Sequence, residues 1–307
     1  MAAATGMTSV AAGRPWWYAF RRGRWLGYIY GGPVILAFLA FNLYPMALGL
    51  YLSFTKWDIL TPAVFVGLQN YATLLGDDLF WQALRQTLYY AVASVAGTTV
   101  LSLSLALALN QRLRSIGVYR TFFFLPAVTS IIAIATVWRW LYNSEYGLLN
   151  ALIGLVGISP VNWLGDASLA MPAVILMSVW RSAGFNTVLF LAGLQSVPQE
   201  YYESAAIDGA GRWQRLRHIT LPLVSPTTFF VVVNGLIGSW QVFDQVYILT
   251  RGGPELATTT VVYLIYSYGF VWYKTGYASA LAYALFLIIL LFTFIQFRLQ
   301  KRWVFYQ

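Results

Sequence analysis

Five long runs without Asp, Glu, Lys or Arg limit what this chain can fold into. These runs are Trp25 to Thr55, Gln86 to Gln111, Thr121 to Trp138, Ser182 to Gln199 and Thr275 to Phe297. A helix of about 20 apolar residues crosses the ~30 Å hydrocarbon core of a bilayer, and most of the runs are long enough. Only 9% of the residues are charged, against roughly 25% in a typical soluble domain. The sequence therefore predicts an all-α polytopic membrane protein.

We predict six transmembrane helices from these runs and the residues around them. They lie at about 26–54, 83–110, 119–141, 169–193, 222–249 and 277–298. The resulting parts are a cytoplasmic N-terminal tail (1–25), a first helix with an external loop (26–80), a core of five helices (81–298) and a cytoplasmic C-terminal tail (299–307).

Two other uncharged stretches, 146–165 and 256–273, are expected to be external loops with short interfacial helices. An additional span at either place would move a basic segment to the outer side of the membrane. Ile158-Ser159-Pro160 and Gly252-Gly253-Pro254 also have the composition of turns.

The positions of the cations predict the orientation in the membrane. One set of connecting segments holds thirteen of the nineteen Lys and Arg residues: Arg14, Arg21, Arg22, Arg24, Arg112, Arg114, Arg120, Arg212, Arg215, Arg217, Arg298, Lys301 and Arg302. The opposite set holds Lys56, Arg85, Arg251 and Lys274 together with most of the acids. Because cytoplasmic loops carry the excess of Lys and Arg, both termini and the segment 196–222 are expected in the cytoplasm.

The composition also excludes several kinds of chemistry. The chain has no Cys and one His, His218, so a disulfide, a thiolate metal site and a histidine cluster are ruled out. No pair of carboxylates or histidines has catalytic spacing, and we expect no catalytic residue and no metal site. The net charge is +9, and most of the cations lie in the segments predicted to be cytoplasmic, as expected for a membrane protein. We therefore expect no nucleic-acid partner.

A polar and basic segment separates two of the apolar runs. The residues from Pro198 to Ile207 favour a short helix, with Pro at its start and two acids near its N-terminus. Asp208 and Gly209 are expected to end it, because Gly adopts positive φ and Asp can cap a following helix. That second helix carries three arginines, and Leu221-Pro222 marks the return to the membrane.

This segment resembles the EAA loop of permease subunits in binding-protein-dependent ABC importers. The residues that carry the resemblance are Glu203, Ser204, Ala205, Asp208, Gly209, Ala210, Ile219, Leu221 and Pro222. Their spacing matches the family pattern, and Ser204 stands where Ala is usual. An ordinary loop whose arginines contact lipid headgroups is the alternative reading, but the spaced set favours the family.

The resemblance implies the type I importer permease fold and a set of partners. The loop would dock onto one of two cytoplasmic ATPase subunits, and a second homologous permease and an extracytoplasmic solute-binding protein would complete the transporter in the lipid membrane. None of the lysines (Lys56, Lys274, Lys301) follows a Gly, so the chain lacks a phosphate-binding loop. ATP and Mg²⁺ would therefore be bound by the ATPase subunits, and this chain would bind no cofactor.

Six further patches are similar to the carbohydrate branch of these permeases, so that the resemblance covers about residues 26 to 300. They are Phe65-Val66-Gly67-Leu68-Gln69-Asn70-Tyr71, Phe124-Leu125-Pro126, Trp138-Arg139-Trp140-Leu141-Tyr142, Phe190-Leu191-Ala192-Gly193-Leu194-Gln195, Val242-Phe243-Asp244 and Thr250-Arg251-Gly252-Gly253-Pro254. The implied cargo is an oligosaccharide, a monosaccharide or a glycerol phosphate derivative.

Polar residues inside the predicted spans are the candidates for a translocation path. We select Asn186, Asn234, Trp240, Gln241 and Asp244; Thr187 and Ser239 are weaker candidates. The alternative role for such residues is bonding between neighbouring helices. A charge at the bilayer centre costs roughly 2.5 to 3.5 kcal/mol or more, and for Arg181 we favour a structural role beside a kink at Ala183-Gly184.

These observations favour a multi-pass permease subunit of the bacterial or archaeal cytoplasmic membrane that imports a sugar or sugar-like solute by alternating access. An importer permease for a non-sugar solute and an ion-coupled secondary transporter are the alternatives. The second alternative needs carboxylates within the spans, and of the ten acids only Asp244 lies in a predicted span.

Overall fold

The computed structural model describes residues 30–111 and 116–305. The predicted tail 1–25 and the cations Arg112 and Arg114 lie outside these ranges. The chain forms two compact units, residues 1–51 and 52–307, and each is described by itself. In the described residues, four helices are long and apolar enough to span a membrane, or six when each of two bent helix pairs counts as one span. The prediction of six spans agrees with the second count.

The described part of the first unit is helical. A helix runs from Tyr30 to Ser53, which lies just past the unit boundary, and its 24 residues are enough to cross a bilayer. It contains a π-helical turn, η1 (Leu39–Leu43), followed by α2 (Tyr44–Ser53). The first predicted span is therefore helical where the structure describes it.

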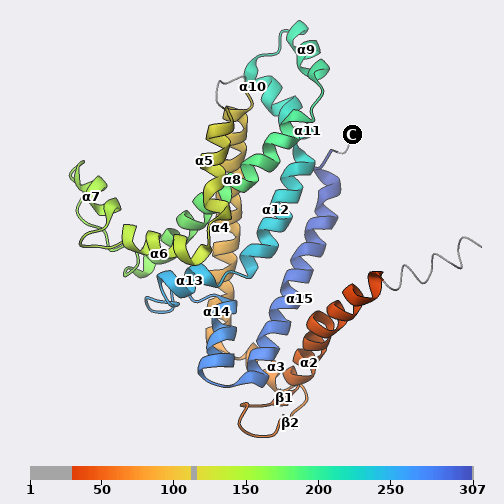
Figure 1. The fold of residues 1–307 in the computed structure, drawn as a ribbon, viewed down its shortest axis with the longest axis vertical. Helices are drawn as coiled ribbons and strands as arrows, with labels where there is room; N and C mark the ends of the chain where they lie inside the picture. Colours follow the sequence, from red (N-terminus) through yellow and green to blue (C-terminus); the bar gives the residue numbers. More distant parts are fainter. Residues whose placement is uncertain (1–29, 112–115, 306–307) are drawn as a thin grey trace, which may run out of the picture. The chain divides into compact units, whose positions relative to one another are not determined.

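Helices make up most of the described part of the second unit (Figure 1). The elements are β1 (Thr55–Lys56), β2 (Val64–Phe65), α3 (Gln69–Leu75), α4 (Asp78–Leu109), α5 (Ile116–Val128), α6 (Ile131–Leu141), α7 (Leu148–Gly154), α8 (Ala167–Gln195), α9 (Gln199–Ile207), α10 (Arg212–Arg215), η2 (Leu216–Thr220), α11 (Leu221–Leu223), α12 (Ser225–Trp240), α13 (Asp244–Leu249), α14 (Val261–Tyr266), η3 (Ser267–Val271), α15 (Thr275–Leu299) and η4 (Gln300–Arg302). The strands β1 and β2 pair antiparallel, with Thr55 opposite Phe65.

The patch at residues 65–71 holds this hairpin in place. The side chain of Asn70 donates through Nδ2 to the carbonyl oxygens of Ser53 and Thr55, each at 2.8 Å. The hydroxyl of Tyr71 donates to Oγ of Ser53 at 2.7 Å. These bonds satisfy backbone carbonyls where the first helix ends, so this part of the resemblance corresponds to a structural anchor.

Helix α4 packs against α8, α12 and α14, and α5 packs against α8. Small residues let these helices approach closely. A Cβ atom added at Gly97 of α4 would lie 3.0 Å from Cγ2 of Val179 in α8. A Cβ added at Gly235 of α12 would lie 3.2 Å from Cγ2 of Val95 in α4.

Helix α8 runs without a break from Ala167 to Gln195. Ala183-Gly184 therefore does not interrupt the helix. A Cβ added at Gly184 would overlap the carbonyl oxygen of Phe123 in α5. The glycine thus permits close packing of two helices, which sequence alone does not distinguish from a helix-breaking role.

The span predicted at 119–141 is not one straight helix. It consists of two helices, Thr121–Val128 and Ile131–Leu141, whose axes differ by 105°. Pro126 has no N–H to donate to the preceding turn, and Ser130 has extended backbone angles (φ −53°, ψ 131°). Hydropathy does not detect this break because both halves are apolar.

The span predicted at 222–249 is also divided. The pair Arg212–Leu223 and Ser225–Trp240 is bent by 61°. Pro226 cannot donate to the carbonyl of Pro222, and Oγ of Ser225 donates to that oxygen at 2.6 Å instead. After Trp240 the chain leaves the helix and begins α13 at Asp244.

Neither of the two stretches predicted as external loops forms a helix long enough to span a membrane. The first contains α7, and the second contains an apolar helix at Val261–Val271. Helix α14 packs into the core of the unit, where the Val261 N–H donates to Oγ1 of Thr87 in α4 at 3.0 Å. Val261 and Leu264 are buried there.

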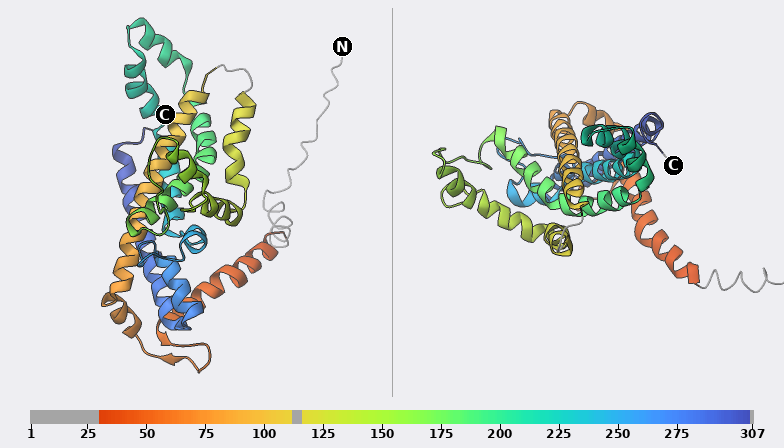
Figure 2. Two further views of the ribbon diagram at one scale, coloured as in Figure 1. Left: turned by 90° about the vertical axis from the view of Figure 1, so that its left-hand side faces the viewer. Right: turned by 90° about the horizontal axis from the view of Figure 1, so that it is seen from above.

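The two ends of the second unit carry different elements. Helices α9 and α10 and the end of α15 lie at one end, and β1, β2 and α3 lie at the other (Figures 1 and 2). The chain just after α15 is held near the start of α12, because the N–H of Phe305 donates to Oγ of Ser225 at 2.9 Å. The segment 196–222 and the C-terminal end of the chain therefore lie at the same end of this unit.

Candidate functional site

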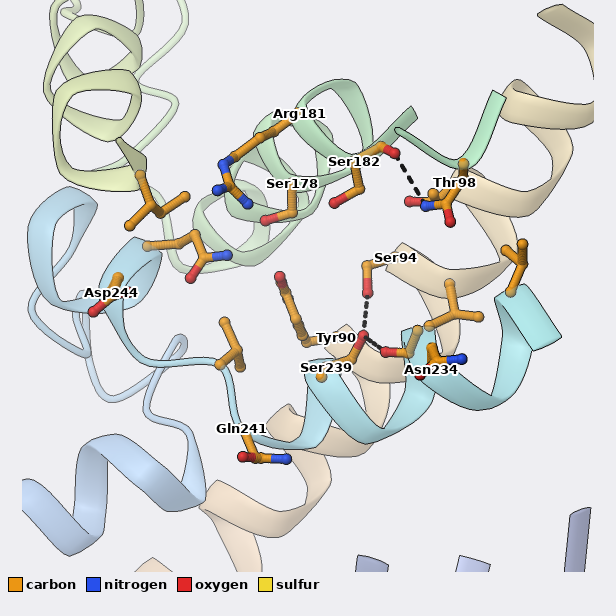
Figure 3. Close-up of a pocket in the computed structure, with 18 of the residues that line it drawn as sticks. Tyr90, Ser94, Thr98, Ser178, Arg181, Ser182, Asn234, Ser239, Gln241 and Asp244 are labelled. Carbon is orange, nitrogen blue, oxygen red and sulfur yellow. Dashed lines mark hydrogen bonds between the residues drawn. The ribbon is translucent and has the colours of Figure 1, made fainter. Parts of the chain in front are cut away.

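A cavity of about 390 Å³ lies between the helices of the second unit. Its polar lining comes from α4, α8, α12, α13 and the segment joining the last two (Figure 3). The polar residues are Tyr90, Ser94, Thr98, Thr99, Ser178, Arg181, Ser182, Asn186, Asn234, Ser239, Gln241, Asp244 and Gln245. A polar cavity within apolar helices is where a membrane protein can hold a hydrophilic solute.

The wall is tied together by bonds within and between the helices. Oγ of Ser94 and Oγ of Ser239 lie 3.3 Å apart across α4 and α12. Ser239 also donates to the carbonyl oxygen of Gly235 at 2.6 Å, and Ser178 donates to that of Val174 at 2.9 Å. Because these hydroxyl protons are used by the protein, the hydroxyl oxygens are the groups available to accept a bond from a solute.

Each of the two asparagine amides on the wall uses one of its two N–H groups within its own helix. Nδ2 of Asn186 donates to the carbonyl oxygen of Ser182, and Nδ2 of Asn234 donates to that of Phe230, each at 3.0 Å. Each amide thus keeps its carbonyl oxygen and one N–H for a solute. Together with the serines, they form a wall rich in acceptors, which suits a solute rich in hydroxyl donors.

Arg181 brings a positive charge to this wall. Its guanidinium points into the cavity in Figure 3, with Ser178 and Ser182 beside it on α8. Its Nε is buried and has no hydrogen-bond partner. Asp244 is the one acid among the described residues that line the cavity, and its carboxylate points away from Arg181 in Figure 3.

The five residues selected for a translocation path are distributed as follows. Asn186, Asn234, Gln241 and Asp244 line the cavity. Trp240 does not: it is 2% exposed, and its ring lies 5.1 Å from that of Phe292 in α15. Gln241, Asp244 and the residues between them come together at the cavity because α12 ends after Trp240, which turns the chain toward α13.

Thr187, a weaker candidate, lies between helices. Its Oγ1 donates to the carbonyl oxygen of Ala183 at 2.7 Å and approaches that of Ser102 in α4 at 3.4 Å. It is buried away from the cavity. Thr187 therefore has the alternative role given for polar residues in spans, which is bonding between neighbouring helices.

Much of the wall consists of residues that were not predicted from the sequence. Tyr90, Ser94 and Thr98 of α4 are spaced by four residues, as are Ser178, Ser182 and Asn186 of α8. That spacing places each set on one face of its helix. A search for polar residues four apart in the apolar runs would have found both sets.

The loop at 196–222 forms two helices joined by a tight turn. Asp208 follows the last residue of α9, and Gly209 has a φ of +77°, which ends the helix as expected. The expected capping of the second helix by Asp208 is wrong. Gly211 precedes α10, and its N–H donates to Oε1 of Gln214 at 2.7 Å.

Between α9 and α10 lies a recess of about 300 Å³. Of the residues that carry the EAA resemblance, Ala205, Asp208, Gly209, Ala210 and Ile219 line this recess. Glu203 and Ser204 are exposed on α9, and Leu221 and Pro222 begin α11. The structure therefore places most of this set around one concave surface.

Two large apolar side chains are exposed on the same loop. Ile207 at the end of α9 is 87% exposed, and Trp213 in α10 is 68% exposed. Two parts of the loop are joined to each other where the hydroxyl of Tyr202 in α9 lies 3.0 Å from Oγ1 of Thr220 in η2. A loop with exposed apolar residues is typical of a surface that binds another protein.

The described residues do not form a metal site, since no group of three or more His, Cys, Asp or Glu comes together in them. The same residues provide no triad or carboxylate pair in the cavity. The arrangement is suited to binding and passing a solute.

Comparison with known proteins gives consistent matches over most of the chain. Residues 9–304 match the family described as binding-protein-dependent transport system inner membrane component. A probable ABC transporter permease of Bacillus subtilis is 35% identical over 294 residues, which is 94% of each chain. A permease of the trehalose/maltose transport system of Thermococcus litoralis is 37% identical over 277 residues, which is 90% of this chain and 94% of the relative.

Solved structures show the same architecture. A chain of a bacterial ABC transporter involved in the import of the acidic polysaccharide alginate has a TM-score of 0.82 and 27% identity, covering 94% of this chain and 99% of that chain. A chain of the alginate transporter in complex with a periplasmic protein bound to an alginate pentasaccharide gives a TM-score of 0.81 and 26% identity, covering 94% and 98%.

Proposed function

Because the chain belongs to the family of inner membrane components of binding-protein-dependent transport systems, we propose that it is the sugar-conducting permease subunit of an ABC importer. The observation that carries the proposal is the cavity between α4, α8 and α12, whose wall is rich in hydrogen-bond acceptors. Sugars are rich in hydroxyl donors, and relatives named for trehalose/maltose, multiple sugars and lactose support this cargo.

The loop between α8 and α12 is the contact with an ATPase subunit. Its support is the EAA spacing, the recess between α9 and α10, and the exposed side chains of Ile207 and Trp213. Two ATPase subunits bind ATP and Mg²⁺, and this chain has no phosphate-binding loop of its own. A second homologous permease completes the transmembrane path.

Both termini face the cytoplasm in this proposal. The C-terminal end of α15 lies at the same end of the second unit as α9 and α10, so the ATPase side and the C-terminus share one face (Figure 1). The hairpin β1–β2 lies at the opposite end, where an external solute-binding protein delivers the sugar. Closure of the ATPase subunits moves the loop, and the cavity opens alternately to each side.

Ion-coupled secondary transport is less well supported. Asp244 lies at the start of α13 and outside the span helices. Among the described residues, the acid that remains in a span helix is Asp78, in the first turn of α4. A coupling carboxylate near the membrane midplane is therefore lacking in the part of the chain that the structure describes.

Purification and reconstitution test the proposal. A tag on this chain should copurify a second permease and an ATPase from the membranes of its host, and proteoliposomes containing this complex and its binding protein should take up sugar only with ATP. Gly209→Val should reduce copurification of the ATPase and uptake together, with Gly154→Ala in α7 as the control. Uptake that persists without ATP, or without an ATPase partner, would contradict the proposal.

A further inference from the structure

We propose that Arg181 makes the cavity selective for sugars that carry an anionic oxygen group, such as the carboxylate of a uronate or a phosphate ester. This inference rests on the proposed function, because it assumes that the cavity holds a sugar. It adds the class of sugar and names the residue that selects it.

The position of Arg181 in its helix is the first argument. It is the fifteenth of the 29 residues of α8, which is the midpoint of that helix. At about 1.5 Å per residue, it is roughly 21 Å from each end. The side chain cannot reach the headgroups of a membrane from there, so its charge must be balanced within the protein or by what the protein binds.

The surroundings of Arg181 are the second argument. Among the described residues, the cavity wall holds one acid, Asp244, whose carboxylate points away from the guanidinium in Figure 3. The Nε of Arg181 is buried and unpartnered. A guanidinium that lines a cavity fits an anionic ligand, because a guanidinium binds carboxylate or phosphate through two parallel hydrogen bonds.

A second recess extends the space around the same side chain. It has a volume of about 410 Å³ and lies between α5 and α8, where Phe124 and Phe185 contribute to its wall. Arg181, Ser182 and Asn186 line both spaces. A solute in either space would contact the guanidinium, while the neighbouring hydroxyl and amide groups would bond its ring hydroxyls.

Arg139 provides an internal comparison. It is the other arginine predicted within a span, and it lies in the last turn of α6, where it is exposed and lines neither space. Substituting Arg139 therefore removes a span cation without changing the cavity. It is a matched control for Arg181.

The experiment compares pairs of sugars that differ only in the anionic group. The complex is purified through a tag on this chain, without the binding protein, so that the binding protein does not determine selectivity. Equilibrium binding is measured for glucose and glucuronate, galactose and galacturonate, mannose and mannuronate, and glucose 6-phosphate. Comparing the uronates with glucose 6-phosphate shows whether the cavity prefers a carboxylate or a phosphate as the anionic group.

In the wild type, at least one anionic sugar should bind about tenfold or more tightly than its neutral counterpart. Arg181→Gln should remove this difference and leave the affinity for the neutral sugar nearly unchanged, which is the change expected when a charge-assisted hydrogen bond is lost. Arg181→Lys should retain part of the preference, and Arg139→Gln should retain all of it.

Equal binding of anionic and neutral sugars by the wild type would overturn the inference, as would an unchanged preference in Arg181→Gln. If Arg181→Gln fails to assemble with the second permease, the binding preference of Arg181→Lys tests the inference instead. A lysine variant that assembles and shows no preference would assign Arg181 to pairing with a partner carboxylate and overturn the inference. Neutral sugars that bind and enter with ATP would leave the proposed function intact in each of these cases.

Discussion

The hydroxyl of Tyr277 donates a hydrogen bond of 2.6 Å to Oδ2 of Asp77, a residue 200 positions earlier in the chain. Asp77 also caps α4, since its Oδ1 accepts from the N–H of Leu79 at 2.9 Å. Tyr268 donates to the same carboxylate at 3.1 Å. One side chain thus joins the start of α4 to η3 and α15 at the end of the second unit that carries the hairpin.

Tyr277→Phe should destabilise the protein by about 1.5 to 3 kcal/mol, because it removes a hydrogen bond to a partly buried carboxylate. The loss should appear as a lower midpoint of thermal unfolding in detergent. Tyr273→Phe removes an exposed hydroxyl nearby and should leave the midpoint unchanged. Equal effects of the two substitutions would show that the bond to Asp77 contributes little.

Gly184→Ala should destabilise the packing of α5 against α8 by about 1 to 3 kcal/mol, because the added methyl group overlaps the carbonyl oxygen of Phe123. Gly117→Ala in α5 is the control, since a Cβ there has no atom within 4 Å. Fluorescence-detected gel filtration after heating measures both variants. A stable Gly184→Ala protein would mean that α5 and α8 can separate without cost.

Asn150→Asp should loosen the loop around α7. Nδ2 of Asn150 donates to the carbonyl oxygens of Val161 and Ser144 at 2.9 and 3.1 Å, and Asp has no N–H to replace these donors. Limited proteolysis should cut residues 146–165 several-fold faster in the variant, whereas Leu152→Ala, at an exposed position of α7, should be cut at the wild-type rate. Cutting at the same rate in all three proteins would contradict this role.

The effect of substituting Gly209 should depend on how readily the new residue adopts a positive φ. Its φ is +77°, and a Cβ there would have no atom within 4 Å, so the cost of a side chain is conformational. Copurification of the ATPase subunit should decrease in the order Gly, Asn, Ala, Val, because Asn accepts this conformation best among the three replacements and a β-branched residue worst. A dependence on side-chain volume alone, with Asn worse than Ala, would contradict the conformational explanation.

Ile207→Ala and Trp213→Ala should each weaken binding of the ATPase subunit, by about 1 to 2 kcal/mol, because they truncate exposed apolar side chains on the proposed docking loop. Leu155→Ala is the control, since Leu155 is 82% exposed and lies in the other loop, after α7. Titration of the purified ATPase against detergent-solubilised complexes measures the affinity. If Leu155→Ala has the same effect, the loop between α8 and α12 is not the docking surface.

Much of the fold follows from local properties of the sequence. The charge-free runs predicted helices of spanning length, and Pro198 and Gly209 correctly predicted where α9 starts and ends. Hydropathy nevertheless treated 119–141 and 222–249 as single helices, because a helix that breaks after Val128 or ends at Trp240 is as apolar as a straight one. Adjacent residues can also differ in environment in a way that the sequence does not predict. Trp240 is buried in the core, whereas Gln241, the next residue, lines the cavity.

The sequence by itself determined that this chain has helices long and apolar enough to cross a membrane, that one loop has the spacing of the EAA motif, and that no Gly-Lys-Ser/Thr phosphate-loop motif is present. Those properties depend on composition and on short spacings, which a chain keeps whether or not it is folded. Only the tertiary structure decided which polar residues share a cavity and where Arg181 points. The reason is that the wall is assembled from helices distant in sequence, such as Ser94 and Ser239, whose contact depends on how closely the helices between them can pack.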